Sequence, residues 1–335
     1  MFAMGTLRQD PATNEWVIVA PDRSNRPQPP VPPRAAVPRF EASCPFCPGN
    51  EHLTPPEIAR FGNSEKWNQR LFPNLYPVLT PDGTIERRGK RMARTMDGVG
   101  AHEVVVESPR HDERLDEMSS EDVTSVLRIW RERYVDLSRD PIKAVIVFKN
   151  FGERAGTSLV HPHSQIVAMP VFPPDYINRY AVATRYYDDT GHCVYLDLLH
   201  SELEAKSRIV AERDGFVALS PFAARLPFEM WIMPREHQPA FDDVGEDELP
   251  VLADLLRDAI GAVRRAAGDP DYNLIVHSTP VGEEARRAFL WHLRLLPRLT
   301  TAAGFELATG MSINTVAPER AAQLLREAIV GAPLG

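Results

Sequence analysis

The sequence predicts an α+β protein of two similar halves, with a mainly antiparallel sheet and flanking helices. Two observations predict this class. A unit of strand, helix, strand, loop and strand occurs twice along the chain. Each copy also has a proline–histidine turn after its first strand, at Pro109–His111 and at Pro234–His237. We expect the halves to be residues 1–178 and 179–335, with the cysteine pair and the His-x-His-x-Gln segment in the first half.

Local patterns justify the elements in order. An N-terminal strand is expected at 15–20, and the proline-rich segment from Arg26 to Pro38 is typical of an extended connector. Ser119, with Asp122 three residues later, predicts the start of an amphipathic helix. The expected strands are 103–108, 144–150 and 161–169 in the first copy and 229–233, 272–277 and 290–296 in the second; the expected helices are 121–137, 174–187, 196–207, 246–266 and 318–329.

Composition limits the classes of function. The chain has 335 residues, of which 43% are hydrophobic and 25% charged, as in a globular protein with a buried core. Its net charge of −8 argues against a nucleic-acid-binding surface. No apolar run is long enough to span a membrane, and no signal-peptide pattern is visible. With three cysteines, two of them close together, the sequence favours a cytoplasmic protein that binds a metal.

The segment His161-Pro162-His163-Ser164-Gln165 carries the most chemical information. On a strand, side chains alternate between faces, so His161, His163 and Gln165 are expected to point the same way. A neutral histidine can attack phosphorus, and a glutamine can donate to a phosphoryl oxygen. The preceding Gly156-Thr157-Ser158 allows the backbone to approach a phosphate closely. The alternative is a pair of surface histidines on an edge strand.

Cys44-Pro45-Phe46-Cys47 is a Cys-x-x-Cys pair in a turn-rich setting. Two thiolates need two more ligands for a tetrahedral zinc site, and His111 and His161 are the best candidates. His102 competes with His111 for this role, and His52 is a weaker competitor. A thioredoxin-like redox pair is the alternative, but that motif is expected to open a helix after a strand. Cys193 stands alone and is expected to be a packed thiol.

Together these segments resemble the galactose-1-phosphate uridylyltransferases, a branch of the histidine-triad superfamily. The resemblance covers nearly the whole chain and depends most on the His-Pro-His-x-Gln segment and the cysteine pair. The other similar segments are Arg23–Pro27, Asn74–Pro77, Ser108–His111, Asn150, Gly156–Ser158, Pro227–Glu229 and Pro234–His237. It implies two histidine-triad-like halves, of which the second is degenerate, and a homodimer.

The resemblance also implies a ping-pong nucleotidyl transfer. His163 would form a covalent bond to the α-phosphorus of a nucleotide sugar, and a sugar 1-phosphate or phosphate would then accept the nucleotidyl group. Gln165 and Ser158 would hold the phosphoryl oxygens, and Zn²⁺ would be bound by Cys44, Cys47, His111 and His161. The implied substrate-binding residues are Arg23, Arg26, Asn74, Leu75, Asn150, Gly156, Thr157, Ser158, Gln165, Phe305, Gly310 and Met311. Arg23 and Arg26 are alternatively solvated charges, and Phe305 a core residue.

Departures from the family pattern leave the substrate open. UDP-glucose–hexose-1-phosphate uridylyl transfer is the first expectation, but Leu75 replaces a polar residue that usually contacts the nucleoside. The segment from Gly304 to Gly310, with Ile313 and Asn314, resembles the ADP-glucose phosphorylase branch, which transfers an adenylyl group from ADP-glucose to phosphate. A second metal site at His237, His277 and His292 is not expected, because Arg294 and Leu290 replace histidines of relatives. Two further alternatives are a simple nucleotide hydrolase and a catalytically lapsed, zinc-stabilised nucleotide-binding protein.

Overall fold

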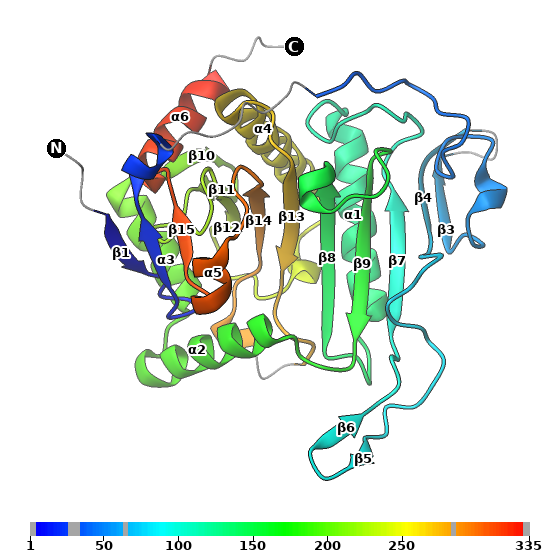
Figure 1. Ribbon diagram of the computed structural model, residues 1–335, viewed down its shortest axis with the longest axis horizontal. Helices are drawn as coiled ribbons and strands as arrows, with labels where there is room; N and C mark the ends of the chain where they lie inside the picture. The colour runs from blue at the N-terminus through cyan, green and yellow to red at the C-terminus, as the bar shows by residue number, and fades with distance from the viewer. Residues whose placement is uncertain (1–4, 26–33, 63–65, 283–285, 331–335) are drawn as a thin grey trace.

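A ten-stranded antiparallel sheet forms the centre of the computed structural model, which describes residues 5–25, 34–62, 66–282 and 286–330 (Figure 1). The strand order is β10-β11-β12-β14-β13-β8-β9-β7-β4-β3. The bounds are Ala59–Gly62 (β3), Trp67–Pro73 (β4), Ala101–Val106 (β7), Ala144–Phe151 (β8), His163–Met169 (β9), Ile209–Arg213 (β10), Phe216–Leu219 (β11), Met230–Pro234 (β12), Tyr272–His277 (β13) and His292–Pro297 (β14).

The order of strands is the same in the two halves of this sheet, counted outward from its middle. β8, β9, β7, β4 and β3 lie on one side, and β13, β14, β12, β11 and β10 on the other. β8 and β13 are the central pair, with Asn150 opposite Asn273. The α+β class with two histidine-triad-like halves is therefore confirmed. The expected boundary at residue 178 falls within the helix α2 (Pro174–Thr190), and the division at that residue stays a prediction.

Two long helices cover one face of the sheet. α1 (Ser120–Leu137) packs on β7, β8 and β9, and α4 (Leu249–Ala267) packs on β10 and β11 and against α1. α6 (Pro318–Val330) lies beside α4 and β10. Their apolar side chains form the main core with the sheet, and Trp130 of α1 donates a 2.7 Å hydrogen bond to Ser164 of β9. This face therefore contributes mainly packing energy.

The opposite face is covered by different segments in the two halves. In the second half, α2 and α3 (Val194–Ala205) pack on β11 and β12. In the first half, the cysteine segment packs on Trp67, Phe72, Val104 and Val106 of β4 and β7. The first half therefore leaves room on this face for a site at β9.

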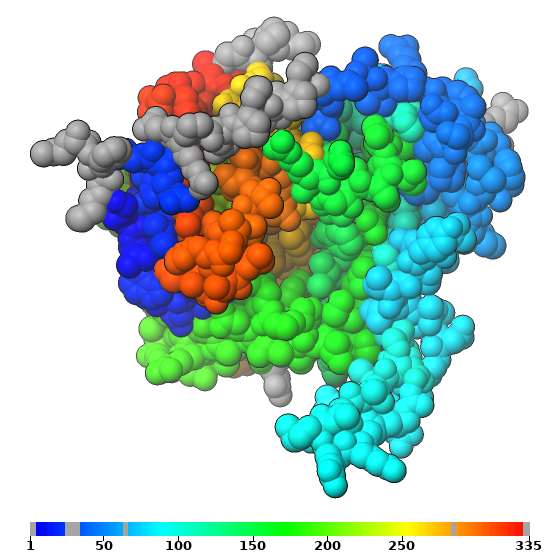
Figure 2. Space-filling view, viewed as in Figure 1, coloured from blue at the N-terminus to red at the C-terminus, as the bar shows by residue number. Residues whose placement is uncertain are grey.

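Smaller elements complete the chain. β1 (Thr6–Gln9), β2 (Trp16–Val19) and β15 (Ser312–Asn314) form a three-stranded sheet, with the helix α5 (Gly304–Thr309) just before β15. β5 (Arg88–Lys90) and β6 (Ala93–Thr95) form an arm that stands clear of the body (Figure 2). Residues 34–38 of the expected connector have no regular secondary structure, and residues 26–33 lie outside the described part. Within the described residues, no helix has both the length and the apolar character needed to cross a membrane.

The start of α1 gives a first prediction. The Ser119 side chain accepts a 3.1 Å hydrogen bond from the Asp122 backbone N–H, which otherwise has no partner within the helix. We expect Ser119→Ala to lower the free energy of unfolding by about 1 kcal/mol, measured by urea unfolding. Ser119→Thr is the matched control and should stay close to the wild type, because it keeps the hydroxyl, which also donates to Asp122 Oδ2 at 2.6 Å. Equal losses in both variants would contradict the capping role.

Candidate active site

Strand β9 places consecutive side chains on opposite faces of the sheet. Ser164, Ile166 and Ala168 face the helices, where Ile166 and Ala168 join the main core. His163 and Gln165 face the other way and line the same pocket. The period of two residues, read from the sequence, therefore describes this part of the site correctly.

The four expected metal ligands lie together next to this strand. The ligand atoms of Cys44, Cys47, His111 and His161 are all within 4.8 Å of one another, and all four residues are buried. The Cys47 Sγ lies 3.5 Å from His111 Nδ1 and 3.6 Å from His161 Nδ1, and the Cys44 Sγ lies 3.8 Å from His161 Nδ1. An S···N edge of about 3.5 Å follows from tetrahedral zinc with ordinary bond lengths. The cluster therefore fits a metal ion of this kind.

The local chain holds these ligands in the required form. The Cys44–Cys47 turn is closed by a 3.2 Å backbone hydrogen bond, and the backbone N–H of Phe46 points at the Cys44 sulfur. His161 Nε2 donates to the Ser108 carbonyl at 2.7 Å, so the proton-free Nδ1 faces the cysteines. Burial lowers the pKa of His161 to about 3, which keeps the ring neutral. A neutral imidazole is the form that binds a metal.

His163 presents one ring nitrogen to solvent-accessible space. Its Nδ1 donates a 2.8 Å hydrogen bond to the His161 carbonyl, which leaves a lone pair on Nε2. Burial lowers the pKa of His163, and the nearby charge of Lys149 lowers it further. The ring also contacts the edge of Phe46, with 5.4 Å between ring centres. His163 is therefore held as a neutral imidazole with Nε2 free to act as a nucleophile.

Two pockets share His163 and Ser158. The first, of about 390 Å³, is mostly apolar and includes Phe46, Leu75 and Gln165. The second, of about 370 Å³, has more charged residues in its lining, among them Glu113 and Lys149, and also includes Asn150. A molecule that extends from one pocket into the other would pass His163. This arrangement suits a ligand with an apolar base on one side of a reacting phosphorus and a polar sugar phosphate on the other.

A buried ion pair lies beneath His163. Lys149 Nζ donates to Glu107 Oε2 at 2.6 Å and to the His163 carbonyl at 3.2 Å. Both side chains are almost fully buried, with 2% and 0% of their side-chain surface exposed. Neither residue was expected from the sequence to belong to the site. Lys149 directly follows the apolar run from Ala144 to Phe148, and a charge at the end of this run was the available signal in the sequence.

Several residues expected at the site do line it. Asn74 and Leu75 are in the first pocket, Asn150 and Thr157 in the second, and Ser158 in both. Gly156 ends the short helix before Thr157 with a φ of +86°, a conformation that favours glycine. The other expected substrate-binding residues within the described chain, Arg23, Phe305, Gly310 and Met311, line neither pocket. Arg26 lies outside the described residues.

The competing histidines have other partners. His102 contacts Gln165 and Asn74 rather than the cysteines, and His52 is exposed. His277 and His292 stack on each other with 5.1 Å between ring centres. Burial lowers the pKa of both rings, and the nearby guanidinium groups of Arg179 and Arg294 lower it further. Two cations at this point disfavour a bound metal ion. His237 lies apart and is hydrogen-bonded to the Phe289 carbonyl at 2.9 Å.

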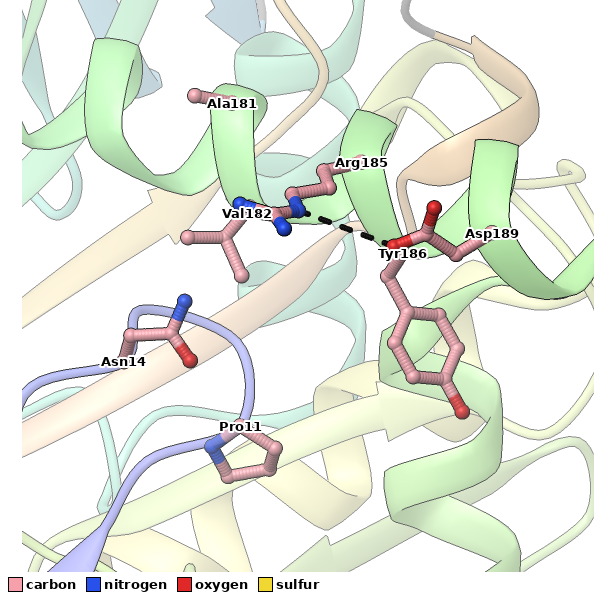
Figure 3. Close-up of a pocket in the computed structure, with 7 residues that line it drawn as sticks. All are labelled: Pro11, Asn14, Ala181, Val182, Arg185, Tyr186 and Asp189. Atoms are coloured by element: carbon pink, nitrogen blue, oxygen red, sulfur yellow. Dashed lines mark ion pairs between the residues drawn. The ribbon is translucent and has the colours of Figure 1, made fainter.

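Another pocket lies between the 11–14 turn and α2 (Figure 3). Its charged residues are Arg185 and Asp189, which pair with each other at 3.7 Å and are largely exposed. A solvated ion pair on an open surface gives no means of catalysis. We therefore assign the site to the pockets at His163.

The fold and the site define the class of protein: a nucleotidyltransferase of two histidine-triad-like halves. Residues 3–173 match the family described as galactose-1-phosphate uridyl transferase, N-terminal domain, and residues 99–332 match a domain of unknown function, DUF4921. The chain belongs to the galactose-1-phosphate uridylyltransferase family. The resemblance seen in the sequence is thereby confirmed.

Three relatives illustrate the range within this family. The chain is 35% identical to an ADP-glucose phosphorylase from Arabidopsis thaliana, covering 96% of this chain and 92% of that protein. It is 31% identical to a galactose-1-phosphate uridylyltransferase from Thermotoga maritima, covering 97% of this chain and 98% of that protein. A crystal structure of an ADP-glucose phosphorylase from Arabidopsis thaliana with bound ADP-glucose superposes with a TM-score of 0.86 and 33% identity, covering 99% of this chain and 100% of that one.

The buried pair beneath His163 gives the second prediction. We expect Lys149→Met to lower the free energy of unfolding by about 3–5 kcal/mol, because it leaves the Glu107 carboxylate buried without a cation. The double variant Lys149→Met/Glu107→Leu removes both charges and should recover most of this loss. Urea unfolding of the two variants and the wild type measures the difference. A double variant as unstable as the single one would contradict the ion-pair explanation.

Proposed function

We propose that this protein transfers a nucleoside monophosphoryl group through a covalent intermediate on His163 Nε2. The observation that supports this most directly is the state of the ring: neutral, held through Nδ1, and open at Nε2 between two pockets. His292 is also held through Nδ1, but it is fully buried and lines neither pocket, so the access of His163 to both pockets is what distinguishes it. The geometry therefore favours catalysis over a lapsed nucleotide-binding protein.

The reaction proceeds in two displacements at the α-phosphorus. In the first, the Nε2 lone pair forms a bond to phosphorus, and the bond to the bridging oxygen breaks, so that a sugar 1-phosphate leaves with the electron pair. The ring becomes positively charged, and the hydrogen bond from Nδ1 to the His161 carbonyl stabilises it. In the second, a phosphate oxygen of the acceptor attacks phosphorus and Nε2 leaves as a neutral imidazole. Gln165 and Ser158, which line the first pocket with His163, would donate to the phosphoryl oxygens.

We infer that Zn²⁺ is bound by Cys44, Cys47, His111 and His161. When bound, the ion supplies a fixed crosslink and no acid or base. The chain's own contribution is geometric: His161 belongs to the cluster through its side chain and holds His163 through its carbonyl. The cluster thereby sets the direction of Nε2.

Uridylyl transfer between UDP-glucose and a hexose 1-phosphate is the first candidate for the substrates, as the sequence suggested and as the Thermotoga maritima relative is named. Phosphorolysis of ADP-glucose is the second candidate, and two observations favour it. Leu75 gives the first pocket an apolar wall, and a relative named ADP-glucose phosphorylase is 35% identical. A homodimer and a cytoplasmic location remain predictions; a monomeric mass in solution at micromolar concentration would contradict the dimer.

The covalent intermediate is the third prediction. Incubation of the wild type with UDP-glucose or ADP-glucose, without acceptor, should add the mass of one nucleoside monophosphoryl group to the intact protein. The nucleotide that gives the faster adduct identifies the donor. His163→Ala should form no adduct and lose turnover by about ten-thousand-fold or more, because the nucleophile is missing.

The control is His200→Ala, which removes an exposed histidine of α3 and should leave adduct formation unchanged. Absence of an adduct with both nucleotide sugars would overturn the proposal. Release of nucleoside monophosphate without any acceptor would instead indicate a hydrolase.

The metal is the fourth prediction. The purified protein should contain about one Zn²⁺ per chain, and Cys47→Ser should contain almost none, as measured by inductively coupled plasma mass spectrometry. Loss of the ion should also lower the melting temperature, because the buried ligands lose their common partner. Cys193→Ser removes a thiol outside the cluster and should keep the metal. A metal-free wild type with full activity would contradict this assignment.

A further inference from the structure

His102 lies beside Gln165 on the site face of the sheet. It belongs to β7, where Val104 is the residue opposite Gln165 on β9. Since His102 and Val104 are two positions apart, they share a face. The imidazole is buried, with 8% of the residue exposed, and its Nε2 is 2.8 Å from Gln165 Oε1. None of the chemistry described above uses this histidine.

The contacts of His102 determine which nitrogen carries the proton. Nδ1 accepts a 3.1 Å hydrogen bond from the Val78 backbone N–H, so it has no proton of its own, and the neutral ring carries its proton on Nε2. The Asn74 amide nitrogen is 3.1 Å from Nε2, but an amide nitrogen cannot accept a hydrogen bond. The Nε2 proton is therefore donated to Gln165 Oε1.

This hydrogen bond also fixes the orientation of the Gln165 carboxamide. A reversed amide would place an NH2 group against the Nε2–H of His102, with two donors facing each other. In the observed orientation the oxygen is engaged, and the NH2 group makes no hydrogen bond within the described part of the chain. That group is left for the pocket that Gln165 shares with His163.

His102 holds the wall of this pocket as well. Its carbonyl accepts a 2.7 Å hydrogen bond from the Asn74 N–H, and its ring accepts one from Val78. These contacts fasten both ends of the 74–78 loop, and Leu75 and Tyr76 of that loop line the first pocket. One residue thus connects the apolar wall to the amide beside the nucleophile.

We propose that His102 is a positioning residue for nucleotidyl transfer. It directs the NH2 group of Gln165 toward the phosphoryl group on His163, and its contacts hold the 74–78 loop that forms the pocket wall. This inference rests on the proposed function, because it assigns Gln165 to the phosphoryl oxygens. Without His102 the carboxamide can rotate and present its oxygen to a negatively charged group, which is repulsive.

Two substitutions at position 102 test this role. His102→Ala removes the donor and the acceptor, and should lower kcat for nucleotidyl transfer by about tenfold or more with a smaller change in KM. His102→Gln supplies an NH2 group for Gln165 and a carbonyl for Val78, and should recover activity to within about threefold of the wild type. A purely structural role would not distinguish these variants in kcat once thermal unfolding shows both to be folded.

A double-variant comparison asks whether His102 acts through Gln165. In the Gln165→Ala background, His102→Ala should have almost no further effect on kcat, because the amide to be oriented is absent. A full tenfold loss in that background, or a His102→Ala variant within twofold of the wild type, would overturn the proposal. If the wild type forms no nucleotidyl adduct at all, the proposed function fails instead, and this inference with it.

The tautomer is a second measurement that does not depend on folding of a variant or on activity. Two-bond ¹H–¹⁵N correlations of histidine-labelled wild-type protein should show His102 as the Nε2–H tautomer, with the His102→Gln spectrum identifying its signals. An Nδ1–H tautomer would overturn the proposal whatever the outcome of the kinetic experiments.

Discussion

The hydrogen bond from His163 Nδ1 to the His161 carbonyl is the constraint on which the site depends. Its acceptor belongs to a residue whose own ring is fixed twice, by Ser108 on one nitrogen and by the cysteine pair on the other. His161 of the cluster and His163 are therefore separated by one residue, Pro162, whose ring restricts the backbone between them. We therefore expect a change that loosens the cluster to alter the direction of His163 Nε2, even though neither cysteine lines the two pockets.

In β9, over three consecutive residues, side chains that line the pocket alternate with a side chain that packs in the core. Ser164 faces α1 and is bonded to Trp130 in the main core, whereas His163 and Gln165 face the pocket on the other side. Packing against α1 therefore fixes the backbone of the site without occupying it. Phe148 is opposite Gln165, so the next residue, Lys149, falls on the same face as Ser164. Its charge is used on Glu107 and the His163 carbonyl.

The sequence predicted those features that depend on local spacing. The two-residue period correctly placed His163 and Gln165 on one face, and Ser119 with Asp122 correctly marked the start of α1. It could not predict pairings that depend on the whole fold, such as the parallel pairing of β15 with β2, or the additional strands β10 and β11. It favoured His111 but left His102 as a competitor, because the strand register and the path of the loop after β7 decide which ring meets the cysteines. Phe305, Gly310 and Met311 were expected at the site through resemblance alone, and nothing in their own spacing indicated a pocket.

The second half shows why only one half of this sheet is suited to catalysis. His292 repeats the position of His163, with Nδ1 3.1 Å from the Leu290 carbonyl, and Arg294 and Glu229 occupy the positions of Gln165 and His102. The second half keeps a polar pair at these positions, but it is a buried ion pair in which Arg294 and Glu229 bond to each other. His292 is fully buried against Tyr195 and Trp231, and Leu290 replaces the ligand that His161 provides. A ring covered by α3 has no access to a substrate, so the same backbone geometry supports packing in one half and a ring open to two pockets in the other.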